Sequence, residues 1–214
     1  MVGGGEWSEG CTFDRTLIDA VGAAEVLILP TGSAYEHPER LVDTAEQWFA
    51  TLGVKARGLM VLARPDASDP ANLDAVRAAR FIYLAGASPM HLRSVLKDSP
   101  LWDALLEQWN GGAALAGSSA GAMVLCDPMV DQRGGAFTLG LGLLEGVAVV
   151  PHLDSWSEEK AHRTQQLAPK GLVVAGVDER TALVRDSSGA WKTEGAGAVT
   201  VWRDGEELGL DALP

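Results

Sequence analysis

Short apolar runs alternate along the chain with segments whose apolar residues recur at helical spacing. This alternation predicts strand–helix–strand units and a parallel β-sheet. Several of the apolar runs lack the two-residue alternation of a half-exposed strand, which favours a sheet covered by helices on both faces. The runs that we expect to form strands are Glu25–Leu29, Leu59–Leu62, Phe81–Leu84, Ala113–Ala116, Val147–Val150 and Leu172–Val177.

The intervening segments carry helix signals. In Pro38–Leu52 the apolar residues form one stripe, and Gly53 follows as a helix stop. Ser88 is suited to cap a helix that begins at Pro89, because its hydroxyl can accept a hydrogen bond from an N–H of the first turn. A further helix is expected over Pro100–Trp109, before a pair of glycines.

The pattern changes after Val177, where short strands and tight turns replace the helices. Three antiparallel strands are expected at Thr181–Arg185, Ala190–Thr193 and Val199–Arg203, with turns at Ser187–Gly189 and Asp204–Gly205. Neither an internal repeat nor a linker-like composition divides the chain. We therefore expect a single domain over residues 1–214. It should be a three-layer α/β sandwich with a mostly parallel sheet and a small antiparallel C-terminal extension.

Composition and charge exclude several classes of function. The 29 acidic and 17 basic residues of this 214-residue chain give a net charge of −12, so phosphate backbones and anionic lipid should be repelled. We expect no nucleic-acid or membrane partner, no transmembrane helix and no secretory signal. Cys11 and Cys126 provide neither a disulfide framework nor a zinc site, which favours a cytoplasmic protein. We also expect no metal and no other cofactor.

One segment combines an apolar strand, a tight turn and a helical run. Its turn reads Gly117-Ser118-Ser119-Ala120-Gly121, a Gly-x-Ser-x-Gly pattern in the context of a nucleophile elbow. The central serine, Ser119, would sit on a strained turn above the sheet, and the flanking glycines would avoid a clash. The Ala120 N–H, at the start of the helix, is the first candidate to stabilise an oxyanion. The alternatives are a purely structural turn and Ser118 as the nucleophile.

A serine nucleophile needs a base, and four histidines are available. Catalytic groups collect at the carboxyl ends of the strands in parallel sheets. His152 directly follows the expected strand Val147–Val150 and is therefore the best candidate. His37 in a polar loop and His91 in a helical segment are expected to be solvated, and His162 could equally lie on the surface.

The orienting acid has more contenders. Asp178 and Glu179 follow the last expected parallel strand, whereas Asp127, Asp131 and Asp154 lie in loops near the proposed site. Most acidic residues of a soluble protein are simply solvated, so position alone leaves this assignment open.

Four segments, in this order, resemble peptidase family S51. They are Gly117–Ala122, Gly140–Leu144, Pro151–His152 and Gly176–Leu183, within a resemblance that runs from residue 26 to residue 185. The family includes aspartyl dipeptidase and cyanophycinase, and its fold is similar to that of class I glutamine amidotransferases.

The resemblance implies a role for each candidate. Ser119 matches the family's nucleophile, His152 its base and Glu179 the acid of its Gly-[Ile/Val]-Asp-Glu motif. An aspartate shortly after the elbow is the other acid that the resemblance allows, and Asp131 is its nearest match. The loop that supplies the second oxyanion donor keeps only Gly86, so backbone donation is preserved there.

The residues that would bind the substrate resemble those of the family less closely than the catalytic candidates do. A protein of net charge −12 needs a local cation to bind an acidic peptide. Arg163 roughly matches an arginine that reads the acidic side chain in aspartyl dipeptidases. The alternative is a solvated Arg163 in contact with Glu159 one helical turn away.

The expected activity is that of a serine exopeptidase acting on short peptides, including peptides with an N-terminal Asp, through an acyl-enzyme. The alternatives are a cyanophycinase-like or other amide hydrolase with the same triad, and a non-catalytic amidotransferase-like binding module. A glutamine amidotransferase would carry Cys in place of Ser119, and an α/β-hydrolase would order its triad Ser, acid, His. The oligomeric state stays open, with a homodimer among the options.

Overall fold

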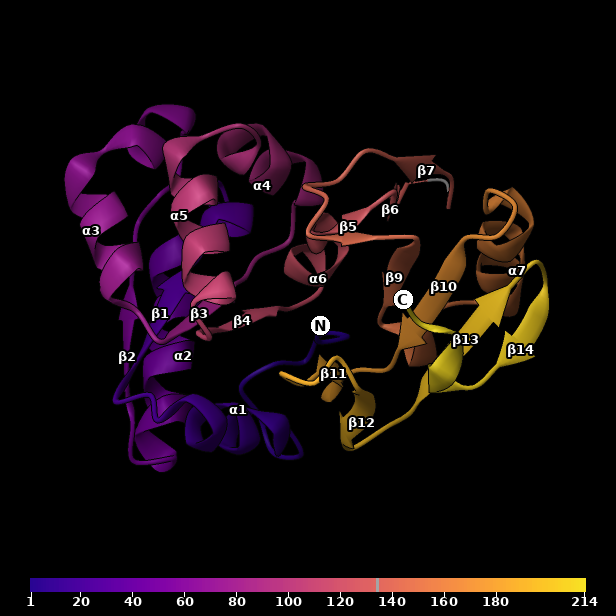
Figure 1. Ribbon diagram of the computed structural model, residues 1–214, viewed down its shortest axis with the longest axis horizontal. Helices are drawn as coiled ribbons and strands as arrows, with labels where there is room; N and C mark the ends of the chain where they lie inside the picture. The colour runs from indigo at the N-terminus through magenta and orange to yellow at the C-terminus, as the bar shows by residue number, and fades with distance from the viewer. Residues whose placement is uncertain (134) are drawn as a thin grey trace. The chain divides into compact units, whose positions relative to one another are not determined.

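The computed structural model describes residues 1–133 and 135–214. The chain forms two compact units (Figure 1): one comprises Asp14–Gly121, and the other comprises Met1–Phe13 together with Ala122–Pro214. The predicted α/β class, with a mostly parallel sheet and an antiparallel C-terminal extension, is confirmed. The expectation that residues 1–214 act as one domain stays a prediction.

The unit Asp14–Gly121 is built on a parallel four-stranded sheet. Its strand order is β2 (Lys55–Gly58), β1 (Glu25–Leu29), β3 (Phe81–Leu84) and β4 (Ala114–Gly117). Leu29 pairs with Leu84, which pairs in turn with Gly117. The carboxyl ends of β1, β3 and β4 therefore meet at one edge of the sheet.

Helices precede and connect these strands, and serine hydroxyls define where two of the helices begin. Ser88 accepts a hydrogen bond from the N–H of His91, and Ser99 accepts one from that of Trp102, as expected for N-caps before a first-turn proline. The helices are α1 (Phe13–Val21), α2 (Pro38–Thr51), α3 (Pro70–Ala78), α4 (Pro89–Leu96) and α5 (Pro100–Asn110), with short 3-10 turns η1 (Thr31–Ser33) and η2 (Arg64–Ser68).

The prediction of a strand at Leu59–Leu62 is wrong. The observed strand, β2, ends at Gly58, and its residues alternate between exposed and half-buried positions. Among the strands of the described residues, β2 pairs with β1 alone, so it is an edge strand that tolerates polar side chains. Leu59 and Val61 are buried in the loop that follows. Their apolar character reflects burial rather than strand pairing.

The other unit contains a mixed four-stranded sheet with the order β14 (Glu206–Leu208), β13 (Val199–Arg203), β10 (Val173–Val177) and β9 (Val147–Pro151). β9 and β10 are parallel and fully buried, and β13 adds antiparallel to β10. A hairpin of β11 (Thr181–Arg185) and β12 (Trp191–Gly195) completes the predicted extension.

The remaining elements of the chain are short, apart from one helix of ten residues. They are α6 (Ala120–Leu125), β5 (Cys126–Asp127), β6 (Met129–Val130), β7 (Phe137–Thr138), β8 (Leu144–Glu145), η3 (Leu153–Ser155), α7 (Glu158–Leu167) and η4 (Leu210–Ala212). No helix in the described part of the chain has the length and apolar character needed to span a bilayer.

Candidate active site

Ser119 lies on a strained turn between β4 and α6. Its φ of 50° is in the left-handed region, which non-glycine residues rarely adopt and which is often found at functional sites. A Cβ at Gly121 would overlap the Leu84 carbonyl oxygen, so glycine is required there. Ser118 is fully buried and its N–H donates to Leu84 O at 3.1 Å, whereas Ser119 is partly exposed. This is the strand–turn–helix geometry of a nucleophile elbow, with Ser119 at its apex.

Gly86 follows the neighbouring strand β3 by two residues. Its φ is +123°, and a Cβ there would overlap the backbone of Gly32 and Ser33. Because Leu84 pairs with Gly117, the Gly86 loop and the Ser119 turn extend from adjacent strand ends. Ala120 is the first residue of α6, a position whose N–H has no carbonyl partner within the helix. Both candidate oxyanion donors thus belong to the sheet edge that carries Ser119.

In the other unit, the structure brings His152 and Glu179 together. His152 directly follows β9 and Glu179 lies two residues after β10, at strand ends where Pro151 pairs with Val177. His152 Nδ1 and Glu179 Oε1 are 2.8 Å apart and form a hydrogen bond. Their side chains are 31% and 42% exposed, so the pair is open to solvent. A carboxylate at Nδ1 holds the imidazole in the tautomer whose Nε2 accepts a proton.

Asp131, the alternative acid, has a different partner. Its carboxylate accepts two hydrogen bonds from the Arg133 guanidinium, from Nε at 3.0 Å and from Nη2 at 2.8 Å. These bonds to Arg133 lower the pKa of the Asp131 carboxyl. In the structure, therefore, Glu179 is bonded to His152 and Asp131 is bonded to Arg133.

Two glycines near the start of the chain, Gly3 and Gly4, lie against His152. The sequence did not lead us to expect this contact. Gly3 O accepts from His152 N at 2.7 Å, and Gly4 O accepts from Arg180 N at 2.7 Å. A Cβ on Gly4 would overlap the imidazole, at 2.5 Å from Nδ1. The run Gly3–Gly5 was a visible signal, because three successive glycines suit a close approach of backbone to a side chain.

Gly4→Ala is expected to displace the His152 ring and lower kcat/KM by about 100-fold, the typical cost of a 1 Å misplacement. Gly205→Ala is the matched control, since Gly205 also has a positive φ (+86°) but nothing lies within 4 Å of its Cβ position. Activity assays and circular dichroism on both variants check this. Equal activity in folded Gly4→Ala and Gly205→Ala would show that the contact with His152 does not matter.

The remaining histidines and Cys126 have other environments. His37 is exposed, as expected, and His162, whose position was left open, is exposed as well. His91 differs from the expectation of a solvated side chain, because its Nε2 lies 2.8 Å from Leu62 O and its ring packs edge-on against Tyr35. Cys126 is fully buried, and burial raises the pKa of its thiol to about 12. Cys126 is therefore protonated at neutral pH and is no nucleophile.

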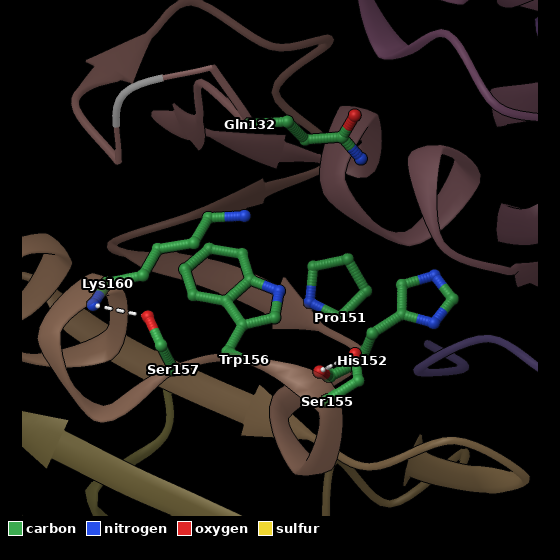
Figure 2. A pocket seen from close by; sticks show the side chains of 7 residues that line it. All are labelled: Gln132, Pro151, His152, Ser155, Trp156, Ser157 and Lys160. Atoms are coloured by element: carbon green, nitrogen blue, oxygen red, sulfur yellow. Dashed lines mark hydrogen bonds between the residues drawn. The ribbon is translucent and has the colours of Figure 1, made fainter.

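A pocket of about 540 Å³ adjoins His152 (Figure 2). The Lys160 ammonium lies 3.7 Å from the centre of the Trp156 ring in this pocket. Arg163 is exposed on the same helix, α7, and its role in substrate binding stays a prediction. The lining residues are Gln132, Pro151, His152, Ser155, Trp156, Ser157 and Lys160. Within residues 1–133 and 135–214, no cluster of His, Cys, Asp and Glu could hold a metal ion.

Comparison with known proteins places the chain in a family. A crystal structure of a peptidase from an acI-B1 Actinobacterium is 31% identical, with a TM-score of 0.85 over 97% of this chain and 91% of that one. Cyanophycinase from Synechococcus elongatus is 26% identical over 197 residues, 87% of this chain. Cyanophycinase from Nostoc sp. PCC 7120 is 25% identical over 213 residues, 94% of this chain and 72% of its own.

The chain spans 61% of the length of the Synechococcus cyanophycinase. The model of peptidase family S51 matches residues 1–192, which is most of the sequence. The chain therefore belongs to peptidase family S51.

Proposed function

We propose that this protein is a serine peptidase that hydrolyses short peptides through Ser119, His152 and Glu179. Membership of family S51 supports a peptidase activity. The observation that carries the proposal is the 2.8 Å hydrogen bond between His152 Nδ1 and Glu179 Oε1, because it holds a partly exposed imidazole in the orientation that a general base needs. The strained turn at Ser119 supports the assignment of the nucleophile.

The proposed reaction proceeds through an acyl-enzyme. Ser119 Oγ attacks the scissile carbonyl while His152 Nε2 accepts its proton, and the N–H groups of Gly86 and Ala120 stabilise the oxyanion. His152 then donates that proton to the leaving amine. In the second half, His152 removes a proton from water, which attacks the ester, and returns it to Ser119 Oγ. Glu179 stabilises the imidazolium in both halves.

For specificity, we infer that Arg163 binds the side chain of an N-terminal Asp. The motivation is the net charge of −12, which makes a local cation necessary for an acidic substrate. Arg163→Lys removes the two-pronged guanidinium and should raise KM for Asp-Leu about 10-fold while leaving Leu-Leu unchanged. Values of kcat/KM for both dipeptides in both proteins check this. If the ratio of kcat/KM for Asp-Leu to kcat/KM for Leu-Leu is unchanged in Arg163→Lys, Arg163 does not bind the Asp side chain of the substrate.

A cyanophycinase-like activity is the second candidate, favoured by the names of the relatives from Synechococcus and Nostoc. Hydrolysis of a dipeptide panel, of cyanophycin and of an esterase control substrate, each with wild type and Ser119→Ala, distinguishes the two. We expect Ser119-dependent cleavage of dipeptides. Ser119-dependent cleavage of cyanophycin alone favours the second candidate, and no cleavage of any amide favours a non-catalytic binding module.

A further inference from the structure

We propose that the pocket beside His152 binds the C-terminal residue of a short peptide, and that the Lys160 ammonium pairs with its α-carboxylate. This inference rests on the proposed function, because it places the carboxylate relative to the reacting amide. It assigns Lys160 and Trp156 a role in substrate binding that differs from the role proposed for Arg163.

The charge of the pocket favours a carboxylate. Among the described residues that line the pocket, Lys160 carries a positive charge and none carries a carboxylate. The protein as a whole has a net charge of −12. The adjacent Glu158 and Glu159 are exposed and are not part of the lining. The amino end of a peptide would need a carboxylate partner here and would be repelled by Lys160. The carboxylate end finds an ammonium.

The Lys160 ammonium is held in position before a ligand arrives. Its Nζ lies 3.7 Å from the centre of the Trp156 ring, within the range of a cation–π interaction. The backbone N–H of Lys160 donates to the Ser157 hydroxyl at 3.3 Å, which caps α7. Figure 2 shows Trp156 and Pro151 between Lys160 and His152, with the Gln132 amide across from them. Because the Lys160 side chain is already ordered by its contact with Trp156, it loses less conformational entropy when a ligand binds.

Because the pocket lies next to His152, it is placed to hold the C-terminal residue of a peptide. In the proposed reaction His152 gives its proton to the leaving amine, and in a dipeptide that amine belongs to the C-terminal residue. The α-carboxylate of that residue is then separated from the reacting nitrogen by one carbon. The volume of about 540 Å³ accommodates a whole residue rather than a carboxylate alone.

Calorimetric titration of the full chain carrying Ser119→Ala tests this without turnover. The probes are Leu-Leu, Leu-Leu amide and Asp-Leu amide. We expect amidation of Leu-Leu to weaken binding about 10-fold, as for loss of one charge-assisted pair. Adding Lys160→Met should weaken the binding of Leu-Leu by the same factor. Leu-Leu and Leu-Leu amide should then bind with equal affinity. Lys170→Met is the matched control, because Lys170 is exposed and lies outside the pocket lining.

The inference is overturned by no binding of Leu-Leu, by an amidation effect that persists in Lys160→Met, or by an equal effect of Lys170→Met. Tight, Lys160-dependent binding of Asp-Leu amide would also overturn it, since the pocket would then read a side-chain carboxylate. Failure of the proposed function is a separate result. Wild type would then leave Leu-Leu intact, while the Ser119→Ala chain would still bind it in a Lys160-dependent manner.

Discussion

Replacing Ser119 with alanine is expected to lower kcat by roughly 10⁴- to 10⁶-fold. Without the Oγ, no acyl-enzyme forms, and only the acceleration due to binding and the oxyanion donors persists. The melting temperature should barely change, because Ser119 is partly exposed and its side chain fills no core volume. Steady-state kinetics on a dipeptide and a thermal melt measure both quantities.

Ser118→Ala is the matched control for this experiment. Ser118 is the neighbouring serine of the same turn and is fully buried, so its hydroxyl faces the interior rather than a substrate. We expect this variant to keep kcat within about 10-fold of the wild type, because the backbone of the turn is unchanged. Loss of activity in Ser118→Ala with retention in Ser119→Ala would exchange the two assignments.

Glu179→Gln is expected to lower kcat by up to about 10⁴-fold with little change in KM. The amide has the shape of the carboxylate but lacks its charge, so the His152 imidazolium loses its counterion. The amide nitrogen can also donate to Nδ1, which moves the imidazole proton to Nε2 and abolishes the base. Kinetics with saturating and limiting dipeptide separate the two constants.

Asp131→Asn is the corresponding control, since it makes the same chemical change at the alternative acid. Asp131 is bonded to Arg133, whose side chain is 80% exposed, and exposed ion pairs contribute little to stability. We expect near-normal kcat in this variant. A large loss in Asp131→Asn combined with normal kcat in Glu179→Gln would transfer the role of the acid to Asp131.

Much of the candidate site follows from local sequence signals. The turn Gly117–Gly121 was predictable because only glycine fits two residues after Ser119, where the Leu84 carbonyl lies. The proximity of His152 and Glu179 was predictable because each follows a buried apolar run, and neighbouring parallel strands end at one edge. The edge strand β2 was missed, since an edge strand needs no apolar run.

Other features depend on contacts that no local pattern contains. Gly4 meets His152 across some 150 positions of sequence, so the glycine run indicated a close approach but not its partner. Lys160 and Arg163 are three residues apart, which is close to one helical turn. Helical periodicity therefore places both residues on the same face of the helix. Only the pocket next to His152 distinguishes them, and Lys160 is the one that lines it.

Covalent labelling tests the central assignment most directly. A phosphonate that reacts only with activated serines is incubated with the wild type and with His152→Ala, and the modified peptide is located by mass spectrometry. We expect one adduct, on Ser119, in the wild type and none in His152→Ala, because the base is needed to activate the hydroxyl. An adduct on Ser118, or equal labelling of Ser119 without His152, would contradict the proposed roles.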